Sequence, residues 1–375
     1  MTAAALVDAR VILSVFAVWH PKSSFTRSLA ENLFRDLCAD PDIPARRGLG
    51  IPVWFRTSNS AGTVPREIRF GTAERTVVFV LADDTMVADA NWRRYVEALV
   101  DKKGETDVVV PVAITRTRNL PPKLGSLQAI ALSRLPQVSW PATLLTQAMH
   151  DLCRCLDPDA AKVRVFLSHA KQDGVDITGA VRRYLHETAM LDDFFDAADI
   201  PDGARFAEVL MRNSGALPVL LAVQTDTYAS REWCRLEVLE AKRRRVPIVV
   251  LTAVKEGEAR SFPYMGNVPV VRWRNRTSLP RVAAALLREV LRNRYFPRRV
   301  EALFKYHGLP PQSEISTYPP ELLTALLRRA DAAEAGGHLR QLVYPDPPLG
   351  TEEVRLIHEF DPDIDPVTPT ILLAS

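Results

Sequence analysis

Glu237 closely follows a tryptophan and a cysteine in the segment Ala229–Leu251, and no cation is placed to neutralise it. On a helix, at about 100° per residue, its side chain lies about 40° from Trp233 and Ala241 and about 60° from Cys234. Because Ala241 occupies the i+4 position, Glu237 lacks the usual ion-pair partner of a helical glutamate. This spacing predicts a carboxylate held in a cleft, where it can stabilise positive charge that develops in a reaction. The alternative is a glutamate on a solvated helix face.

Alternating strands and helices must position this glutamate. Strands are predicted at Val163–His169, Leu217–Val223 and Val246–Leu251, and helices at about 175–188 and 206–212. The helix that carries Glu237 is expected to begin near Ser230, a favourable N-cap residue. The alternation predicts a doubly wound α/β domain with a parallel sheet. Glu237 then follows the carboxyl end of a strand, where such sheets bind ligands.

The first part of the chain repeats this order of elements. In both halves an apolar strand, a polar loop and a tryptophan follow one another, as in VVFVLADDTMVADANW and VLLAVQTDTYASREW. Ser14 and Ser168 are 154 residues apart, whereas Trp92 and Trp233 are 141 apart, a mismatch that loops of different length explain. We therefore interpret residues 11–114 as a related unit that arose by internal duplication. Two unrelated α/β domains are the alternative.

The first half departs from the pattern around the glutamate. Four residues after Trp92 stands Val96, and Glu97 comes one residue later. One residue turns a helical side chain by about 100°, so Glu97 is expected to point elsewhere. This half is therefore predicted to lack the chemistry of Glu237 and to serve in packing, sensing or docking a partner.

The composition is that of a globular protein with a sizeable core. Of 375 residues, 47% are hydrophobic and 25% charged, and the net charge is +3. The near balance of acids and bases gives no support for nucleic-acid binding. No stretch reaches the ~18 apolar residues that a membrane span requires. Four cysteines in so long a chain indicate a reducing, cytoplasmic setting, and no Cys or His cluster predicts a metal site.

At these residues the sequence resembles a known family. The segment Ser230–Glu237, SREWCRLE, is similar to the S-x-x-W-C-x-x-E segment of TIR (Toll/interleukin-1 receptor) domains. Val165–Asp173 resembles the first box of that family, Phe194–Phe206 its second strand and following loop, and VVRWRN at 270–275 its third box, through Trp273. The resemblance covers residues 163–295 and implies a flavodoxin-like, doubly wound fold.

The resemblance also implies a domain organisation. It consists of a degenerate TIR-like domain at 1–140, a linker at 141–162, a TIR domain at 163–295 and a small, mainly helical, Pro-rich extension at 296–375.

Many bacterial and plant members of this family, and one animal axonal member, cleave NAD+ between nicotinamide and ribose. Their catalytic glutamate stands at the position of Glu237. The resemblance thus implies an NAD+ glycohydrolase that takes NAD+ as a substrate and needs no cofactor. The residues expected to bind the substrate are Phe166, Ser168, His169, Lys171, Gly203 and Trp233. The alternatives are a core role for Trp233 and a strand-end hydrogen-bonding role for His169, and Lys242–Arg245 is expected to be a solvated helix end.

The family further implies partners. Bacterial relatives serve in conflict systems such as anti-phage defence, and TIR enzymes act as assemblies. Self-association through the TIR domains is therefore expected, with a trigger or partner protein acting through the first domain or the extension. A second hypothesis is a non-catalytic scaffold for assembly and signalling. A third is an N-ribosyl transferase that acts on nucleosides, which the W-C-x-x-E context disfavours.

Overall fold

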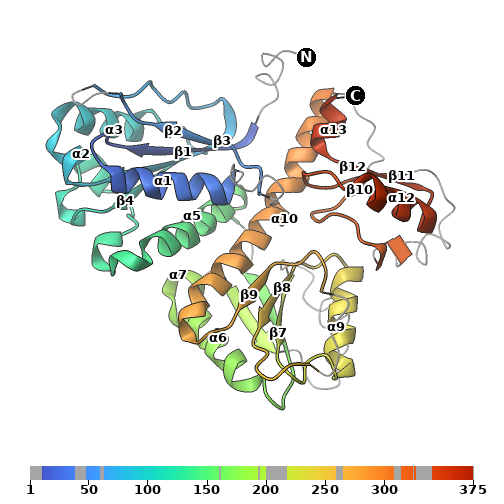
Figure 1. Ribbon diagram of the computed structural model, residues 1–375. Coiled ribbons are helices and arrows are strands. Elements are labelled where there is room, and N and C mark those ends of the chain that lie inside the picture. Colours follow the sequence, from blue (N-terminus) through green and yellow to red (C-terminus); the bar gives the residue numbers. More distant parts are fainter. Residues whose placement is uncertain are drawn as a thin grey trace. The chain divides into compact units, whose positions relative to one another are not determined.

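The computed structural model describes residues 11–38, 48–59, 63–159, 162–192, 195–199, 218–258, 265–307, 314–323, 325–326 and 340–374. The chain divides into two compact units (Figure 1). Unit 1 comprises residues 1–158 and 301–309, and unit 2 comprises residues 159–300 and 310–375.

Unit 1 is built on a four-stranded parallel sheet in the order β2-β1-β3-β4. Its strands and helices are β1 (Val11–Trp19), α1 (Ser24–Leu37), β2 (Val53–Arg56), β3 (Ala73–Ala82), α2 (Asp84–Ala88), α3 (Ala90–Lys102), β4 (Val108–Ala113), α4 (Pro122–Gly125) and α5 (Trp140–Leu156). Short 3-10 helices lie at Thr117–Asn119, Leu132–Arg134 and Gln137–Ser139. The central strands are buried almost throughout, as expected for a sheet covered on both faces.

Unit 2 contains a five-stranded parallel sheet in the order β6-β5-β7-β8-β9. In chain order this is 2-1-3-4-5, the flavodoxin-like arrangement. Its elements are β5 (Val163–His169), α6 (Val175–Glu187), α7 (Ala189–Asp192), β6 (Phe195–Asp199), β7 (Pro218–Gln224), α9 (Glu232–Arg243), β8 (Ile248–Thr252), β9 (Val270–Arg272), a 3-10 helix (Arg276–Ser278) and α10 (Leu279–His307). Helices α6 and α9 lie on opposite sides of the sheet (Figure 1). The predicted α/β class with two doubly wound parallel sheets is confirmed.

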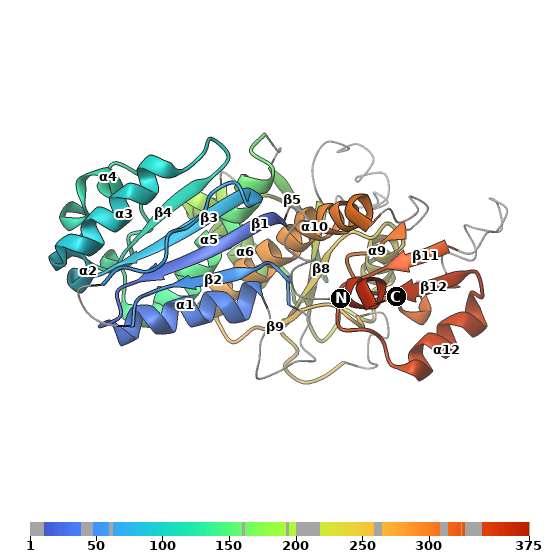
Figure 2. The same cartoon turned by 90° about the horizontal axis from the view of Figure 1, so that it is seen from above.

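Residues 310–375 of the C-terminal extension belong to unit 2 and add a sheet that the sequence does not predict. Three short parallel strands pair in the order β10-β11-β12, with bounds Glu314–Ile315, Arg340–Val343 and Ile364–Val367. Helices α12 (Thr351–Phe360) and α13 (Pro369–Ala374) complete the described part of this region (Figure 2). Strands of two to four residues are too short to give a periodic signal.

Two predicted boundaries are wrong. Most of the segment 141–162, expected as a linker, is the helix α5, whose apolar side chains at Leu144, Ala148 and Leu152 are buried. Pro141 does not interrupt this helix because proline is tolerated in the first turn. The boundary at 295/296 falls inside α10, which continues through Pro297.

No helix in the described part of the chain has the length and apolar character needed to cross a membrane.

Candidate functional site

A chain of hydrogen bonds ends at the carboxylate of Glu237. The Ser168 hydroxyl donates to Glu237 Oε2 at 2.5 Å, and the Tyr228 hydroxyl lies 2.7 Å from Ser168 Oγ. A serine hydroxyl has a single proton, so a serine that donates to Glu237 must accept from Tyr228. Ser168 is only 1% exposed and Tyr228 is fully buried, whereas Glu237 is half-buried. The site therefore has a carboxylate at its surface and a hydroxyl pair beneath it.

The fold brings these residues together from three elements. Side chains alternate along β5, so Phe166 and Ser168 share the face of the sheet that packs against α9. Cys234 and Val238 bury the inner face of α9 against that same cluster. Tyr228 lies in the loop between β7 and α9 and joins the cluster too. The carboxyl end of the sheet thus holds the site, as the doubly wound order predicts.

Burial sets the charges at the site. It raises the pKa of Glu237 to about 7, although the hydrogen bond from Ser168 works in the opposite direction. Burial, and next the charge of Glu237, raises the pKa of Cys234 to about 12. Burial also raises the pKa of Tyr228 well above its ordinary value. Near pH 7, therefore, Cys234 and Tyr228 are neutral, and Glu237 divides between its acid and its ionised form.

Two further carboxylates at this edge were not singled out from the sequence. Asp173 accepts hydrogen bonds from the hydroxyls of Thr225 and Thr227, both at 2.7 Å, and so ties the loop after β5 to the loop after β7. Glu258 accepts from Gln224 Nε2 at 2.9 Å, and burial raises the pKa of its carboxyl. The Asp-Gly and Glu-Gly dipeptides in these loops predict turns, but no local sequence pattern predicts which other strand these carboxylates lie next to.

The other predicted site residues do not all lie beside Glu237. Phe166 is fully buried in the core beneath the site. His169 follows Ser168 and points to the other face of the sheet, where its Cβ lies 3.0 Å from the position a Cβ would take on Gly174 at the start of α6. Lys171 is exposed in the loop after β5.

Trp233 is 59% exposed on α9, one turn before Glu237, so its alternative role as a core residue is excluded. Gly203 lies outside the described residues, as does the helix predicted at 206–212.

The predicted N-cap of α9 is wrong by one residue. The Ser230 hydroxyl donates to the carbonyl of Thr227 at 2.7 Å instead of capping α9. Arg231 is the N-cap of α9, without a side-chain capping bond. A serine hydroxyl can bond to the backbone of a turn as well as to the N-terminus of a helix, and here it bonds within the turn that carries Tyr228.

Unit 1 provides an internal comparison for the site, because three features give the same offset in residue number between corresponding positions of the two units. The N-caps of α3 and α9, Asp89 and Arg231, are 142 residues apart. The same offset relates the buried positions of the two helices, which are Trp92, Val96 and Leu99 in α3 and Cys234, Val238 and Ala241 in α9. It also relates the strand partners of Phe16 and Phe166, which are Val78 and Leu220.

This register corrects the predicted alignment of the halves. Trp92, fully buried, corresponds to Cys234 and not to the exposed Trp233. In the same way Val18 stands at the place of Ser168, Met86 at that of Tyr228 and Tyr95 at that of Glu237. The sequence comparison matched the conspicuous tryptophans, whereas the positions that face the core determine the helix register. Unit 1 therefore has two apolar side chains, Val18 and Met86, and a tyrosine whose hydroxyl donates to the Arg66 carbonyl, where unit 2 has its hydrogen-bond chain.

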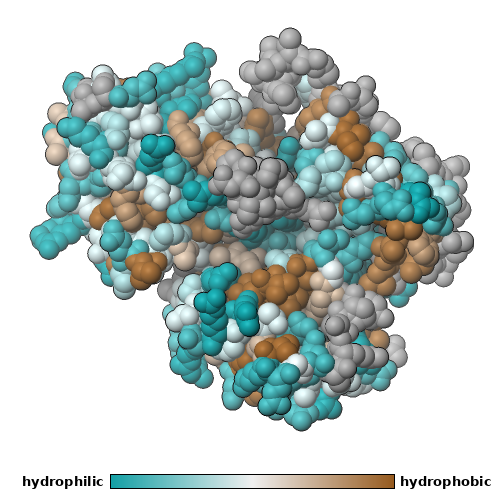
Figure 3. Space-filling view, viewed as in Figure 1, coloured by the Kyte–Doolittle hydropathy of each residue, from teal (hydrophilic) through white to brown (hydrophobic). Residues whose placement is uncertain are grey.

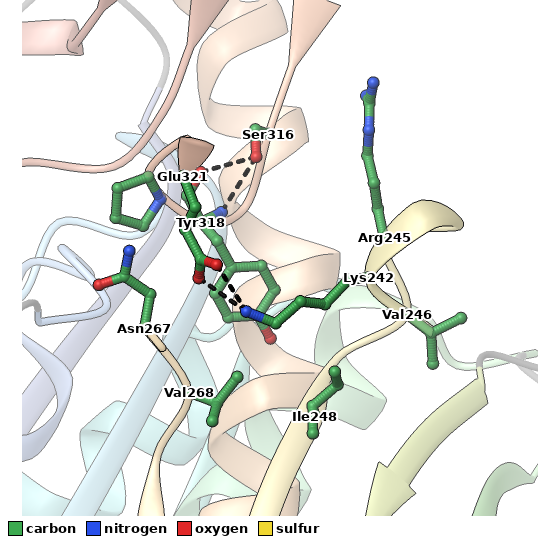
Figure 4. A pocket seen from close by; sticks show the side chains of 10 residues that line it. Lys242, Arg245, Val246, Ile248, Asn267, Val268, Ser316, Tyr318 and Glu321 are labelled. Carbon is green, nitrogen blue, oxygen red and sulfur yellow. Dashed lines mark hydrogen bonds and ion pairs between the residues drawn. The ribbon is translucent and has the colours of Figure 1, made fainter. Parts of the chain in front are cut away.

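A pocket at the C-terminal end of α9 is a second feature of unit 2 (Figure 4). It is lined by Lys242, Arg245, Val246, Ile248, Asn267, Val268, Ser316, Tyr318, Pro319 and Glu321. Figure 4 shows Lys242 and Glu321 pointing toward each other and Arg245 extending away. Lys242 Nζ donates to Glu321 Oε2 at 2.6 Å, to Glu321 Oε1 at 2.9 Å and to the Gly266 carbonyl at 2.9 Å.

The predicted solvated end of α9 is therefore wrong in part. The Lys242 side chain is only 7% exposed and its three donors are used within the chain. Arg245 pairs with Glu314, so both cations attach the extension to α9. Arg244 pairs with Glu240 one turn earlier, at 2.5 Å. The Lys242 charge is already neutralised, so the candidate chemistry remains at Glu237.

Among the described residues, no group of three His, Cys, Asp or Glu side chains is arranged to hold a metal ion. No protein-family model matches the chain, and no curated protein matches it.

Proposed function

We propose that unit 2 is an NAD+ glycohydrolase of the TIR type, in which Glu237 is the catalytic carboxylate. The observation that carries this proposal is the half-buried Glu237 carboxylate, held by Ser168 at the carboxyl end of a 2-1-3-4-5 sheet. The W-C-x-x-E segment around it supports the same assignment. A role in anti-phage defence or another conflict system is part of the proposal and rests on the resemblance alone.

The reaction suits a site with one carboxylate and neutral neighbours. Nicotinamide leaves NAD+ as a neutral molecule, because the electrons of the breaking C–N bond cancel the charge of its ring. No general acid is needed for that departure. The ribose becomes oxocarbenium-like, and an ionised carboxylate below the ring stabilises this cation. Water then adds at the ribose carbon and loses a proton, which gives ADP-ribose.

The half-buried position of Glu237 matters for this chemistry. Burial raises the pKa of its carboxyl to about 7, so the ionised form is under-solvated and gains from a cation placed next to it. The exposed Trp233, one turn earlier on the same helix, is available to stack on the nicotinamide or adenine ring. Lys171, exposed in the loop after β5, is the candidate to approach the phosphates.

Self-association is a second candidate function. Trp233 and Leu236 are three residues apart on α9 and are 59% and 47% exposed, which makes them neighbours on one apolar stripe. Figure 3 shows one face of the molecule, on which apolar patches alternate with polar surface. A scaffold that only assembles would use this stripe and would leave NAD+ intact.

The test compares nicotinamide release from NAD+ by the full chain and by Glu237→Gln, at high protein concentration. Removing one charge-stabilising group typically costs ~2.7–4 kcal/mol of transition-state stabilisation, or a factor of ~10²–10³ in rate. We expect a loss of this size in the variant. Equal, measurable rates in the two proteins would refute the role of Glu237, and no release by either would favour the scaffold.

A further inference from the structure

We propose that Tyr228 is a positioning residue of the site. Its hydroxyl donates to Ser168, so that Ser168 donates its own proton to Glu237 and holds the carboxylate in one orientation. The inference rests on the proposed function, because Glu237 is the group that acts on the substrate. It concerns a residue that lies outside the W-C-x-x-E segment.

The geometry fixes the direction of the two hydrogen bonds. With Tyr228 Oη 2.7 Å and Glu237 Oε2 2.5 Å from Ser168 Oγ, the serine lies between a neutral hydroxyl and a carboxylate. An ionised carboxylate can only accept, so the Ser168 proton must point to Glu237. The Tyr228 hydroxyl then supplies the proton that Ser168 accepts. Each bond polarises the next, so the pair is a stronger donor to Glu237 than Ser168 would be alone.

Both hydroxyls are buried, which keeps this arrangement in place. Ser168 is 1% exposed and Tyr228 0%, so water does not compete for their lone pairs. The Tyr228 ring packs in the same core cluster as Phe166 and Cys234. Because its ring is packed in the core, the Tyr228 hydroxyl occupies one position. The hydrogen bonds through Ser168 then fix the position of the Glu237 carboxylate.

Several other groups can influence the titration of Glu237. On α9 there is Cys234, which interacts with Glu237 and is also bonded to Ser168; Arg231 at the N-cap acts on Cys234, and Glu258 acts on Tyr228. The Tyr228 phenol and the Cys234 thiol stay neutral up to high pH, because burial raises the pKa of each. Arg231 is bonded to Gln172. Glu258 is the one other carboxyl among these groups, and substitutions at Tyr228 and Ser168 leave it in place.

The proposal predicts a graded change in the protonation of Glu237. Ser168→Ala removes a hydrogen bond to the ionised carboxylate and is expected to raise the pKa of Glu237 by ~1–2 units. Tyr228→Phe keeps the ring and removes only the polarising donor. It is expected to raise that pKa by a smaller amount, ~0.1–0.6 units, since cooperative strengthening amounts to roughly 10–30% per bond.

The experiment measures the pKa of Glu237 directly, by carbon NMR titration of the full chain labelled at glutamate Cδ. Glu237→Gln identifies the resonance by its absence. The matched control is Tyr184→Phe on α6, at the other face of the sheet, where burial also raises the tyrosine pKa and the hydroxyl is bonded to Thr188. We expect the order Ser168→Ala above Tyr228→Phe above wild type, with Tyr184→Phe unchanged.

An unchanged pKa in Tyr228→Phe would overturn the proposal, as would equal shifts in both tyrosine variants. Ser168→Ala and Tyr228→Phe, assayed for NAD+ cleavage, should lose kcat several-fold without a change in KM if Tyr228 positions the catalytic group, whereas Tyr184→Phe should keep the wild-type kcat. If the chain releases no nicotinamide but the NMR series holds, the positioning stands and the proposed reaction fails. The two failures are therefore distinguishable.

Discussion

The burial of Glu237 predicts that the carboxylate lowers the stability of the folded protein near neutral pH. Folding raises its pKa from the ordinary 4.5 to about 7. A group with a raised pKa in the folded state contributes its full stability below about 4.5, and that stability is lost as the pH rises through about 7. Replacing Glu237 with glutamine removes the titration. The amide oxygen of glutamine can still accept the proton of Ser168.

The magnitude follows from the shift. About 2.5 units between the ordinary and the folded pKa correspond to an upper value of ~3 kcal/mol at 1.36 kcal/mol per unit. We expect Glu237→Gln to be as stable as the wild type at pH 4.5 and more stable by up to ~3 kcal/mol at pH 8. Substitutions that increase stability at a strained active site commonly reduce activity.

The assay is calorimetry of the full chain at a series of pH values, following the transition that shifts in the variant. Two compact units can unfold separately, so the shifted transition is the one to analyse. A stability difference that does not depend on pH would refute the reasoning. So would a variant that is less stable than the wild type at pH 8, since either result means that Glu237 is well solvated.

Two further substitutions test the packing around the site. Lys242→Met or Glu321→Leu removes one partner of a largely buried ion pair and is expected to cost ~3–5 kcal/mol in urea unfolding. The double variant Lys242→Met/Glu321→Leu should cost less than the sum, and single losses below ~1 kcal/mol would contradict the pairing. Trp92→Ala empties a core position and is expected to cost ~3–5 kcal/mol. Trp233→Ala should change stability by less than ~0.5 kcal/mol while raising KM for NAD+, and equal costs for the two tryptophans would contradict the register between the units.

Local patterns sufficed to predict most of the sheet of unit 2. The run VRVFLSH was predicted as a strand at the bounds that β5 has, and the helix after it ends one residue from its predicted end. The first is a short run rich in apolar and branched residues and the second has apolar residues at helical spacing, so no tertiary information is needed. The Ser168–Glu237 contact joins residues 69 apart, and the predicted parallel order already brought their elements to one edge.

The remaining features depend on packing that no local pattern contains. Tyr228 lies in a loop rich in threonine, aspartate and serine, where an aromatic residue gives no sign that it is buried. The Lys242–Glu321 pair joins residues 79 apart, and Glu321 follows β10, a strand of the sheet that was not predicted. The match of Trp92 with Trp233 failed because residue type does not determine which side of a helix faces the core.

The central claim is that an ionised Glu237 cleaves NAD+, and the pH profile of kcat/KM for nicotinamide release tests it most directly. This quantity reports the free enzyme, whose Glu237 has a pKa of about 7. We expect kcat/KM to increase through that pH, by ~5- to 10-fold between pH 6 and pH 8, and to be lost in Glu237→Gln. A wild-type rate that falls over this range, or a variant with the rate and profile of the wild type, would contradict the account.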